Sequence, residues 1–306
     1  MKVFSAILFF AVLLGPLSAS ALELALPLYA GASDPVLVEM VDLDPRPGSC
    51  DANGGELARD GSRYTALMLP ERLVHHGVYV LAAAAGRVSR VGMTDSGAVS
   101  VSIMHDNNWQ TTYAGIAPDS LSVSVGNTVE QGAPLGLLAH GRKGIHSALQ
   151  FMVTRAGRAY CPFSGVPEGG GCGSRGVPMW TMRAELAMAY RSEAVVDAGF
   201  GFNSPAGVVF PAPPFAFPAQ SDPVFCATVM GARSGDIMHL SIHSGHSPVA
   251  TRKIVIQHEK KITSECLAVP ARSGLSKSFR GEMRLERERD GMRATVLKAS
   301  ASGSWR

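Results

Sequence analysis

Alternating apolar and polar positions run through the middle of the chain and predict short β-strands. Val99 to Ile103 alternates with a period of two, the pattern of a half-buried strand. Trp109 to Ala114 is expected to be its hairpin partner, with the turn at Asp106 to Asn108, because aspartate and asparagine favour turns. Further short runs continue the meander, at 80–82, 86–88, 121–125, 134–138 and 148–154. The pattern predicts a β-sheet or barrel.

The C-terminal part of the chain returns to short strands after an interruption. Gly165 to Gly173 is glycine-rich and is expected to be a loop, and Met179 to Tyr190 is the best helix candidate, with apolar residues three and four apart. A proline-rich stretch from Pro205 to Pro223 follows. Strands are then expected at 224–230, 237–242, 254–256, 265–269, 283–287 and 293–297. They predict a small immunoglobulin-like β-sandwich.

The expected fold class is therefore all-β, with two domains and a boundary near residue 200. Residues 22–165 form the first β-domain, residues 166–200 a connector with a short helix, and residues 201–306 the C-terminal sandwich. A chain of 306 residues is long enough for two cores. Its 17% of charged residues and abundant glycine and proline suit short strands joined by tight turns.

The first 21 residues have the order of a cleavable signal peptide. Lys2 precedes an apolar run from Val3 to Leu14. Gly15-Pro16 breaks the run, and Ala19-Ser20-Ala21 supplies small residues for cleavage. The run is shorter than the roughly 20 residues that a spanning helix needs, so an uncleaved anchor is the weaker alternative. We expect export to the periplasm, a mature chain from about Leu22, and no membrane span after cleavage.

Five cysteines then lie in a compartment where disulfides persist. No Cys-x-x-Cys pair is present, so neither a zinc knuckle nor a thioredoxin-type site is supported. Cys226 with Cys266 would staple the C-terminal region, while Cys50 would pair with Cys172 or Cys161 and leave one cysteine free. Cys161 has no neighbouring histidine and acid that would make it a nucleophile, so we expect a disulfide partner or an inert thiol.

The net charge of +3 is too small to indicate a nucleic-acid partner. The basic excess lies toward the C-terminus, where Glu282, Glu286 and Glu288 interrupt it. We expect a solvated strand face there.

A series of short motifs follows in order between Val80 and Phe163. They are Val80-x-Ala82 with Gly86-x-Val88, then Val101-x-Ile103-x-His105 with Trp109-Gln110-Thr111-x-Tyr113-Ala114, then Val125-Gly126-x-x-Val129-x-x-Gly132-x-Pro134-Leu135-Gly136, and finally Ala148 to Val153 with Gly157 and Pro162-Phe163. Asp42-x-Asp44-Pro45, Asp60-Gly61 and Leu69-Pro70 lie upstream. Together they resemble an envelope subgroup of the lysostaphin-type (LytM-like) zinc endopeptidases, which cleave peptidoglycan. The resemblance implies the duplicated hybrid-motif β-fold of that family.

The resemblance also implies where zinc would be held. Family members use a His-x-x-x-Asp pair and the second histidine of a His-x-His pair, while its first histidine and one after Tyr-Ala assist the bound water. These positions fall on Ser62, Ala66, Gln150, Ala148 and Gly115, in that order. Alanine and glycine offer no side-chain lone pair, and serine and glutamine are poor zinc ligands. Catalytic zinc needs about three protein ligands, so we expect no cofactor and a pseudoenzyme.

Other histidines keep a zinc site open as an alternative. His75-His76-Gly77 imitates the family's His-x-Gly start, but the aspartate position would then be Tyr79. A relocated site built from His105, His140 and His146 would restore a zinc endopeptidase. Each of these histidines is more often a hydrogen-bonded or surface residue.

We expect a non-catalytic envelope factor that binds peptidoglycan or regulates a periplasmic cell-wall hydrolase. Asn108, Trp109 and Tyr113 are candidates for its recognition surface, although aromatic residues on a hairpin are more often core. One alternative is an active zinc metalloendopeptidase that cleaves peptidoglycan peptides through displaced ligands. Another is a structural envelope adaptor that acts through the C-terminal sandwich.

Overall fold

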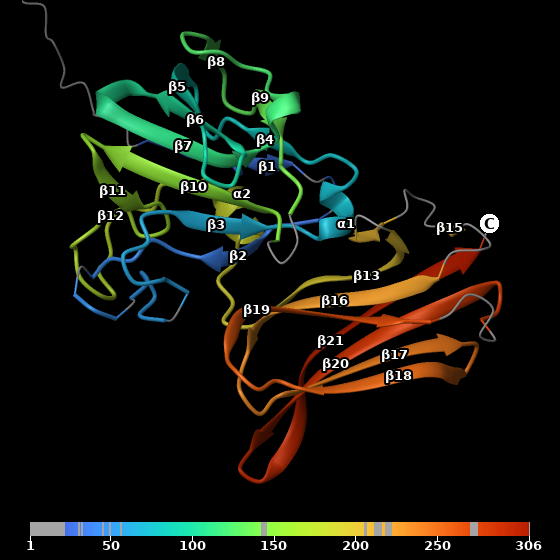
Figure 1. The fold of residues 1–306 in the computed structure, drawn as a ribbon. Helices are drawn as coiled ribbons and strands as arrows, with labels where there is room; N and C mark the ends of the chain where they lie inside the picture. The colour runs from blue at the N-terminus through green and yellow to red at the C-terminus, as the bar shows by residue number, and fades with distance from the viewer. Residues whose placement is uncertain are drawn as a thin grey trace, which may run out of the picture.

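The computed structural model describes residues 22–29, 31, 33–44, 46–48, 50–55, 57–141, 146–204, 207–210, 216–217, 222–269 and 275–305. The expected signal peptide, Pro45 and much of the proline-rich stretch lie outside the described residues. The fold is nearly all β, as expected, and has two units, one at the upper left of Figure 1 and one at the lower right.

A nine-stranded sheet forms the centre of the first unit (Figure 1). Its main path is β12-β11-β10-β7-β6-β5-β8, with β3 on β10 and β2 on β3. The strands are β2 (Val36–Glu39), β3 (Thr65–Met68), β5 (Gly86–Met93), β6 (Val99–Met104), β7 (Trp109–Ile116), β8 (Thr128–Val129), β10 (Ala148–Arg155), β11 (Arg158–Cys161) and β12 (Val166–Pro167). A smaller sheet contains β1 (Leu28–Tyr29), β4 (Tyr79–Leu81) and β9 (Pro134–Leu137).

The alternation in the sequence places one face of these strands in the core. Val99, Val101 and Ile103 are buried on β6, and the expected β6–β7 hairpin is confirmed. Its turn at Asp106–Asn108 is a 3₁₀ turn, with Asn107 and Asn108 at positive φ, a conformation that asparagine tolerates.

The expected strand at 121–125 is wrong, since this segment is irregular. It follows a 3₁₀ turn at Pro118–Ser120, and the Asn127 side chain accepts a hydrogen bond from the Ser124 N–H. Turn contacts therefore satisfy backbone groups that a ladder would otherwise use.

The helices are short. The expected helix at Met179–Tyr190 is observed as α2 (Met182–Ala187), capped by the Thr181 hydroxyl, because Trp180 still pairs with Leu24 in a β-bridge. The helix α1 (Glu71–Val74), which follows Pro70, was not expected. Among the described residues, the helices are too short or too polar to cross a membrane.

The second unit is the expected β-sandwich. One sheet contains β13 (Ala194–Ser204), β14 (Gly207–Val209), β16 (Pro223–Ala232) and β19 (Lys260–Ala268). The other contains β15 (Ala216–Phe217), β17 (Ile237–Ser244), β18 (Ser247–Val255), β20 (Ser278–Arg289) and β21 (Met292–Trp305). Their inner faces share a core around Phe225, Met283 and Leu285. Gly281 lets the sheets approach, since a β-carbon there would overlap the Phe225 ring.

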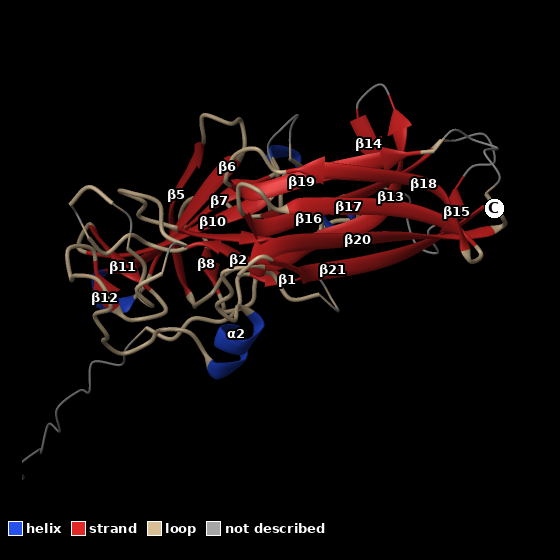
Figure 2. Ribbon diagram, turned by 90° about the horizontal axis from the view of Figure 1, so that it is seen from below, coloured by secondary structure: helices blue, strands red, loops and turns tan. Residues whose placement is uncertain are grey.

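The sandwich begins earlier in the chain than the expected start at residue 201. β13 starts at Ala194, where it pairs with Met230 of β16. Ala194, Val196 and Met230 also belong to the core cluster of the first unit, so this sheet is covered on both sides at its start. Figure 2 shows the sandwich strands extending away from the first unit.

Both disulfides join segments that are distant in sequence. Cys226 pairs with Cys266 across the neighbouring strands β16 and β19, with a Cα–Cα distance of 4.1 Å. Cys50 pairs with Cys172, with a Cα–Cα distance of 5.6 Å, and Cys161 is free and buried. The choice that the sequence left open for Cys50 is thereby resolved.

Candidate functional site

Four of the five positions that the resemblance assigns to zinc chemistry meet on β3, β7 and β10. Ala66 of β3 and Ala114 of β7 both lie opposite Gln150 of β10. Next to them, a β-carbon on Gly115 would lie 2.6 Å from the carbonyl oxygen of Ala148. Leu149 and Phe151 of β10 are buried in the core. Because side chains alternate along a strand, Ala148 and Gln150 share the opposite face.

The fifth position, Ser62, lies just before β3 and is buried. Its carbonyl oxygen accepts a hydrogen bond from the Asp42 N–H at 2.8 Å, and its hydroxyl faces the Tyr64 carbonyl oxygen at 3.4 Å. Asp42 in turn accepts hydrogen bonds from the N–H groups of Cys50 and Gly61. The upstream aspartate motif thus organises this loop through its backbone.

The donor set on this face does not fit zinc. Ala66, Ala148 and Gly115 have no donor atoms in their side chains, and the Gln150 amide is neutral and exposed. Gly115 has a φ of 111°, so a histidine there would be strained and would overlap Ala148.

The three candidate recognition residues differ in their exposure to solvent. Tyr113 is fully buried, and its hydroxyl accepts hydrogen bonds from the Ala83 N–H (2.7 Å) and from Thr111 (3.0 Å). Burial raises the pKa of Tyr113 to about 12. The prediction that Tyr113 lines a surface is therefore wrong. Trp109 is only 9% exposed and packs edge-on against Tyr160, so it is also mainly a core residue. Asn108 is exposed, and its binding role stays a prediction.

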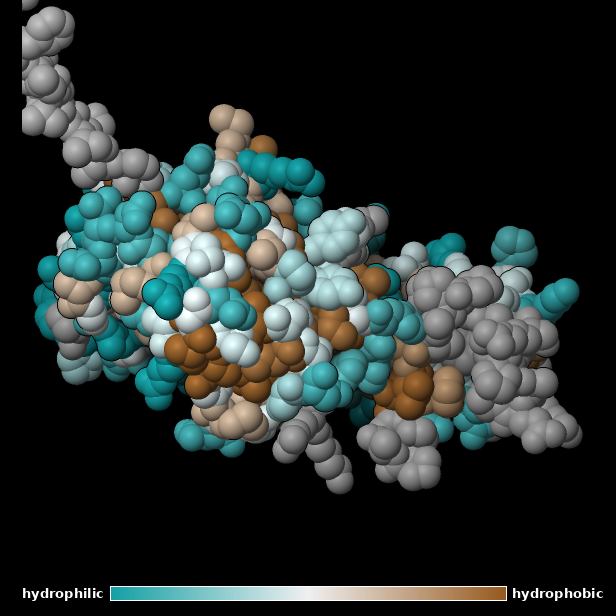
Figure 3. Space-filling view, turned by 90° about the horizontal axis from the view of Figure 1, so that it is seen from above, coloured by the Kyte–Doolittle hydropathy of each residue, from teal (hydrophilic) through white to brown (hydrophobic). Residues whose placement is uncertain are grey.

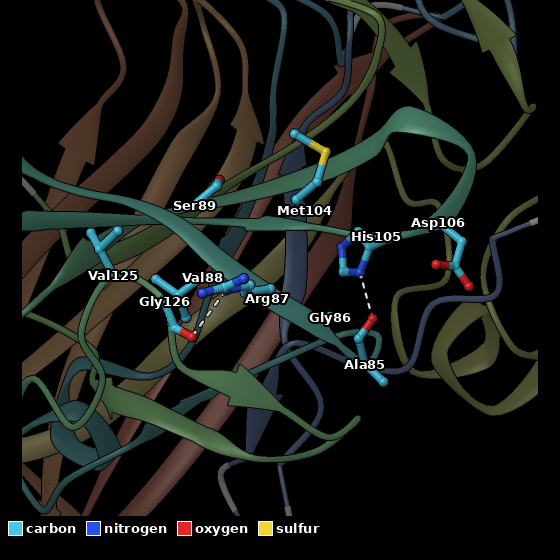
Figure 4. Close-up of a pocket in the computed structure, with 10 residues that line it drawn as sticks. All are labelled: Ala85, Gly86, Arg87, Val88, Ser89, Met104, His105, Asp106, Val125 and Gly126. Atoms are coloured by element: carbon cyan, nitrogen blue, oxygen red, sulfur yellow. Dashed lines mark hydrogen bonds between the residues drawn. The ribbon is translucent and has the colours of Figure 1, made fainter.

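A cavity of about 710 Å³ opens beside β5 and β6 (Figure 4). His105 lies on its wall, with Nδ1 2.7 Å from the Ala85 carbonyl oxygen and Nε2 2.8 Å from the Thr111 hydroxyl. Burial lowers the pKa of His105. Across the cavity, Arg87 donates a hydrogen bond to the Gly126 carbonyl oxygen (Figure 4). With both ring nitrogens engaged, His105 is a structural residue.

The relocated set of His105, His140 and His146 is not brought together. His105 is held by Ala85 and Thr111, whereas the His146 Nε2 contacts the Ser264 hydroxyl of β19 at 3.1 Å. The alternative three-histidine site is therefore not formed, and His105 and His146 are hydrogen-bonded residues, as we expected for each histidine.

His140 instead lies in a different cluster. Among the described residues, Glu71, His75 and His140 form one group of potential metal ligands, with all three ligand atoms within 4.8 Å of one another. The two imidazole rings stack with their centroids 4.8 Å apart. Burial and the nearby His140 lower the pKa of His75, whereas Glu71 raises it.

Neighbouring groups fix the Glu71 carboxylate. The Ser147 hydroxyl donates to it at 2.9 Å, and the backbone N–H groups of Ser147 and Gly141 each donate at 3.3 Å. Glu71 was not expected here, although the spacing Glu71-x-x-x-His75 at a helix is a recognisable signal because residues four apart share a helix face. His140 comes from the β9–β10 connection and carries no such local signal.

Other features suggest no chemistry. Burial raises the pKa of the Cys161 thiol, as for an inert cysteine. Hydrophobic residues gather over the middle of the first unit in the view from above (Figure 3). Tyr29 and Tyr79, which pair across β1 and β4, are 60% and 50% exposed. We assign this face no role.

Solved structures of similar fold come from several bacteria. Csd3 from Helicobacter pylori is 17% identical with a TM-score of 0.34, over 48% of this chain and 35% of that chain. The catalytic domain of lysostaphin from Staphylococcus simulans is 16% identical with a TM-score of 0.30, over 40% of this chain and 85% of that chain. The SpoIIQ–SpoIIIAH pore-forming complex matches at 17% identity and a TM-score of 0.36, over 49% of this chain and 94% of that chain.

The chain thus spans about a third of the length of Csd3. No curated protein matches it. The model of peptidase family M23 matches residues 73–162, which run from the end of α1 to the residue after β11. These residues include β7 and β10, on which Gly115, Ala148 and Gln150 lie. Residues 73–162, within the first unit, thus match peptidase family M23 and form a LytM-type domain.

Proposed function

We propose that this chain is a non-catalytic factor of the cell envelope, exported to the periplasm, whose M23 domain binds peptidoglycan or regulates a cell-wall hydrolase. The observation that carries the proposal is that Ala66 and Gln150, two positions to which the resemblance assigns zinc ligands, lie opposite each other and offer no suitable ligand. Zinc lowers the pKa of bound water to about 7 only when protein ligands retain the ion. Without such ligands, this face has no activated water for peptide hydrolysis.

Two further observations support an envelope location. Two disulfides are typical of proteins in oxidising compartments. Peptidase family M23, which this domain matches, acts on peptidoglycan, a component of the envelope. A face without metal can still contact a peptide, here through the exposed Gln150 amide.

Binding is tested by co-sedimentation of the mature protein with purified sacculi and by pull-down with periplasmic amidases. We expect retention by one of these partners, reduced severalfold in Gln150→Ala because the exposed amide on the groove face is lost. Gln257→Ala, an exposed residue of the sandwich, serves as the matched control and should bind normally. Failure to recover the wild-type protein with either partner would count against the proposal.

A second candidate function is a zinc endopeptidase that uses displaced ligands, and the cluster of Glu71, His75 and His140 favours it. This candidate requires muropeptide release that disappears in His75→Ala. The first proposal requires no release from wild type or variant. One digestion of sacculi with added zinc therefore separates the two functions.

A further inference from the structure

We propose that the outer face of the sandwich sheet β18-β17-β20-β21 binds a glycan that carries carboxylate groups. The inference rests on the register of these four strands. It does not involve the M23 groove and does not depend on the proposed function. Figure 1 shows β17 and β18 on the side of the sandwich that lies away from β3 and β10.

The pairing of the four strands places basic residues in a single row. His239 of β17 lies opposite Lys253 of β18 and also opposite Arg284 of β20. Arg284 in turn lies opposite Lys298 of β21. Leu240, which follows His239, is buried in the sandwich core, so the alternation of side chains turns the row to the outer face. The two lysines and the arginine are exposed there.

The row is electrostatically unfavourable without a ligand, because like charges directly opposite each other destabilise a sheet. The acids on this face of β20 already have partners. Glu282 pairs with Arg280, and a Glu286 oxygen lies 3.1 Å from the His239 Nε2. The cations of the row that have no acidic partner among the described residues are Lys253, Arg284 and Lys298. A bound anion would relieve their repulsion.

A cavity of about 450 Å³ lies on this face and contains both cations and hydroxyl groups. His239, Lys253 and Arg284 line it, and so do Ser241 and Thr251, which lie opposite each other in the next row. Ammonium and guanidinium groups form strong hydrogen bonds with carboxylates. Hydroxyl groups both donate and accept hydrogen bonds, as sugar hydroxyls require. The cavity therefore offers partners for the acidic groups and for the sugars of a glycan.

The shape of the row favours a polymer with singly charged groups. Neighbouring strands lie about 4.8 Å apart, so the row extends over about 14 Å with one basic residue on each strand. A lone anion would contact only part of it. Apart from the buried Phe279, β17, β18 and β20 contain no phenylalanine, tyrosine or tryptophan. The aromatic rings on which nucleic-acid bases stack are therefore missing, and an acidic glycan fits better.

The experiment titrates oligogalacturonate, in which every sugar carries a carboxylate, into the mature chain with both disulfides intact. Isothermal calorimetry at pH 7.5 and low ionic strength measures the affinity. We expect binding that weakens as salt is added, because salt screens charges at the surface. The methyl-esterified glycan is the control ligand. It keeps the sugars but lacks the charges, so it should not bind.

The double variant Lys253→Gln with Arg284→Gln should bind about tenfold more weakly, because two ion pairs with the ligand are lost. Arg90→Gln with Arg183→Gln is the matched control. It removes the same net charge from exposed residues of the first unit and should keep wild-type affinity. Circular dichroism confirms that each variant folds. If the first double variant does not fold, the single change Lys298→Gln carries the test.

Three results would overturn the proposal. One is a wild-type protein that does not bind oligogalacturonate. Another is equal weakening in both double variants, which would show attraction to net charge alone. The third is tighter binding of a single-stranded oligonucleotide than of the glycan. Because oligogalacturonate contains no peptide, these outcomes are independent of the retention on sacculi that tests the proposed function.

Discussion

At position 115 the backbone conformation decides which side chain can be present. Gly115 has a φ of 111°, and a β-carbon would lie 2.6 Å from the Ala148 carbonyl oxygen. A histidine could assist a zinc-bound water here only if β7 and β10 shifted apart. Substitution of Gly115 by histidine alone would therefore strain the backbone and overlap Ala148.

The first prediction concerns Gly115→Ala. We expect it to lower the free energy of unfolding by about 2–4 kcal/mol, from positive-φ strain and steric overlap together. Gly132→Ala is the control, because its φ is 83° with nothing within 4 Å of the added carbon. It should cost only about 1 kcal/mol. Urea denaturation measures both, and equal costs would refute the predicted overlap.

The second prediction concerns His105 and pH. Burial lowers its pKa in the folded state from the ordinary value of 6.5, so below pH 6.5 the unfolded chain binds more protons than the folded one. Stability due to His105 is therefore complete above pH 6.5 and is lost as the pH falls through the folded-state pKa. Urea midpoints between pH 7.5 and pH 5 should fall less steeply in His105→Gln than in wild type.

His75 and His146 have pKa values lowered in the same direction, so part of the slope remains in that variant. His246→Gln, at an exposed turn, should keep the full slope. An unchanged slope in His105→Gln would refute the prediction.

At the scale of elements, local patterns identified most strands of the sheet. The β6–β7 hairpin and β10 were predictable because alternation and turn residues are properties of neighbouring residues. Residues 121–125 also alternate, yet the segment is irregular and its Ser124 N–H is bound by the Asn127 side chain. The start of β13 at Ala194 depends on its pairing with Met230 of β16, 36 residues later, which no local pattern encodes.

For the candidate sites too, features encoded by local sequence were predictable, whereas features that depend on distant segments were not. The order of the motifs along the chain predicts that Ala66 and Gln150 belong to one groove, and the two residues lie opposite each other on β3 and β10. The cluster of Glu71, His75 and His140 was missed because it joins one short helix to a distant connection. Tyr113 was misjudged because a hairpin aromatic gives no sign of which face it occupies until the strand register is known.

The third prediction concerns the two disulfides. Chain-entropy arguments give roughly 4 kcal/mol for Cys226–Cys266 and roughly 5 kcal/mol for Cys50–Cys172, because their sequence separations are 40 and 122. We expect the variant with Cys50 and Cys172 both replaced by alanine to lose more free energy of unfolding than the variant with Cys226 and Cys266 both replaced. Guanidinium denaturation measures the losses. A smaller loss for the longer loop would show that loop length does not govern their contributions.

At the scale of the whole molecule, the two units are joined by shared core residues and by polar contacts. Besides the Arg72–Asp197 pair, Lys261 of β19 donates to the Leu57 carbonyl oxygen at 2.7 Å. Burial raises the pKa of Asp197, while Arg72 opposes that rise. The Asp197 carboxylate at this junction therefore needs the Arg72 guanidinium to offset the cost of its burial.

The fourth prediction tests this junction. Arg72→Ala leaves Asp197 buried without its partner, and we expect a loss of about 2 kcal/mol, below the full cost for a buried pair because Arg72 is partly exposed. Arg63→Ala, which removes the exposed pair with Glu168, is the control and should cost under about 1 kcal/mol. Chemical denaturation that gives equal losses would show that the Arg72–Asp197 pair does not stabilise the junction.

The most direct test of the whole account is muropeptide release from purified sacculi by the mature protein with zinc supplied, followed by liquid chromatography. We predict no soluble muropeptides beyond the buffer control, because Ala66, Ala148 and Gly115 provide no group that could hold or activate a metal-bound water. Release of muropeptides that stops when zinc is chelated would contradict it.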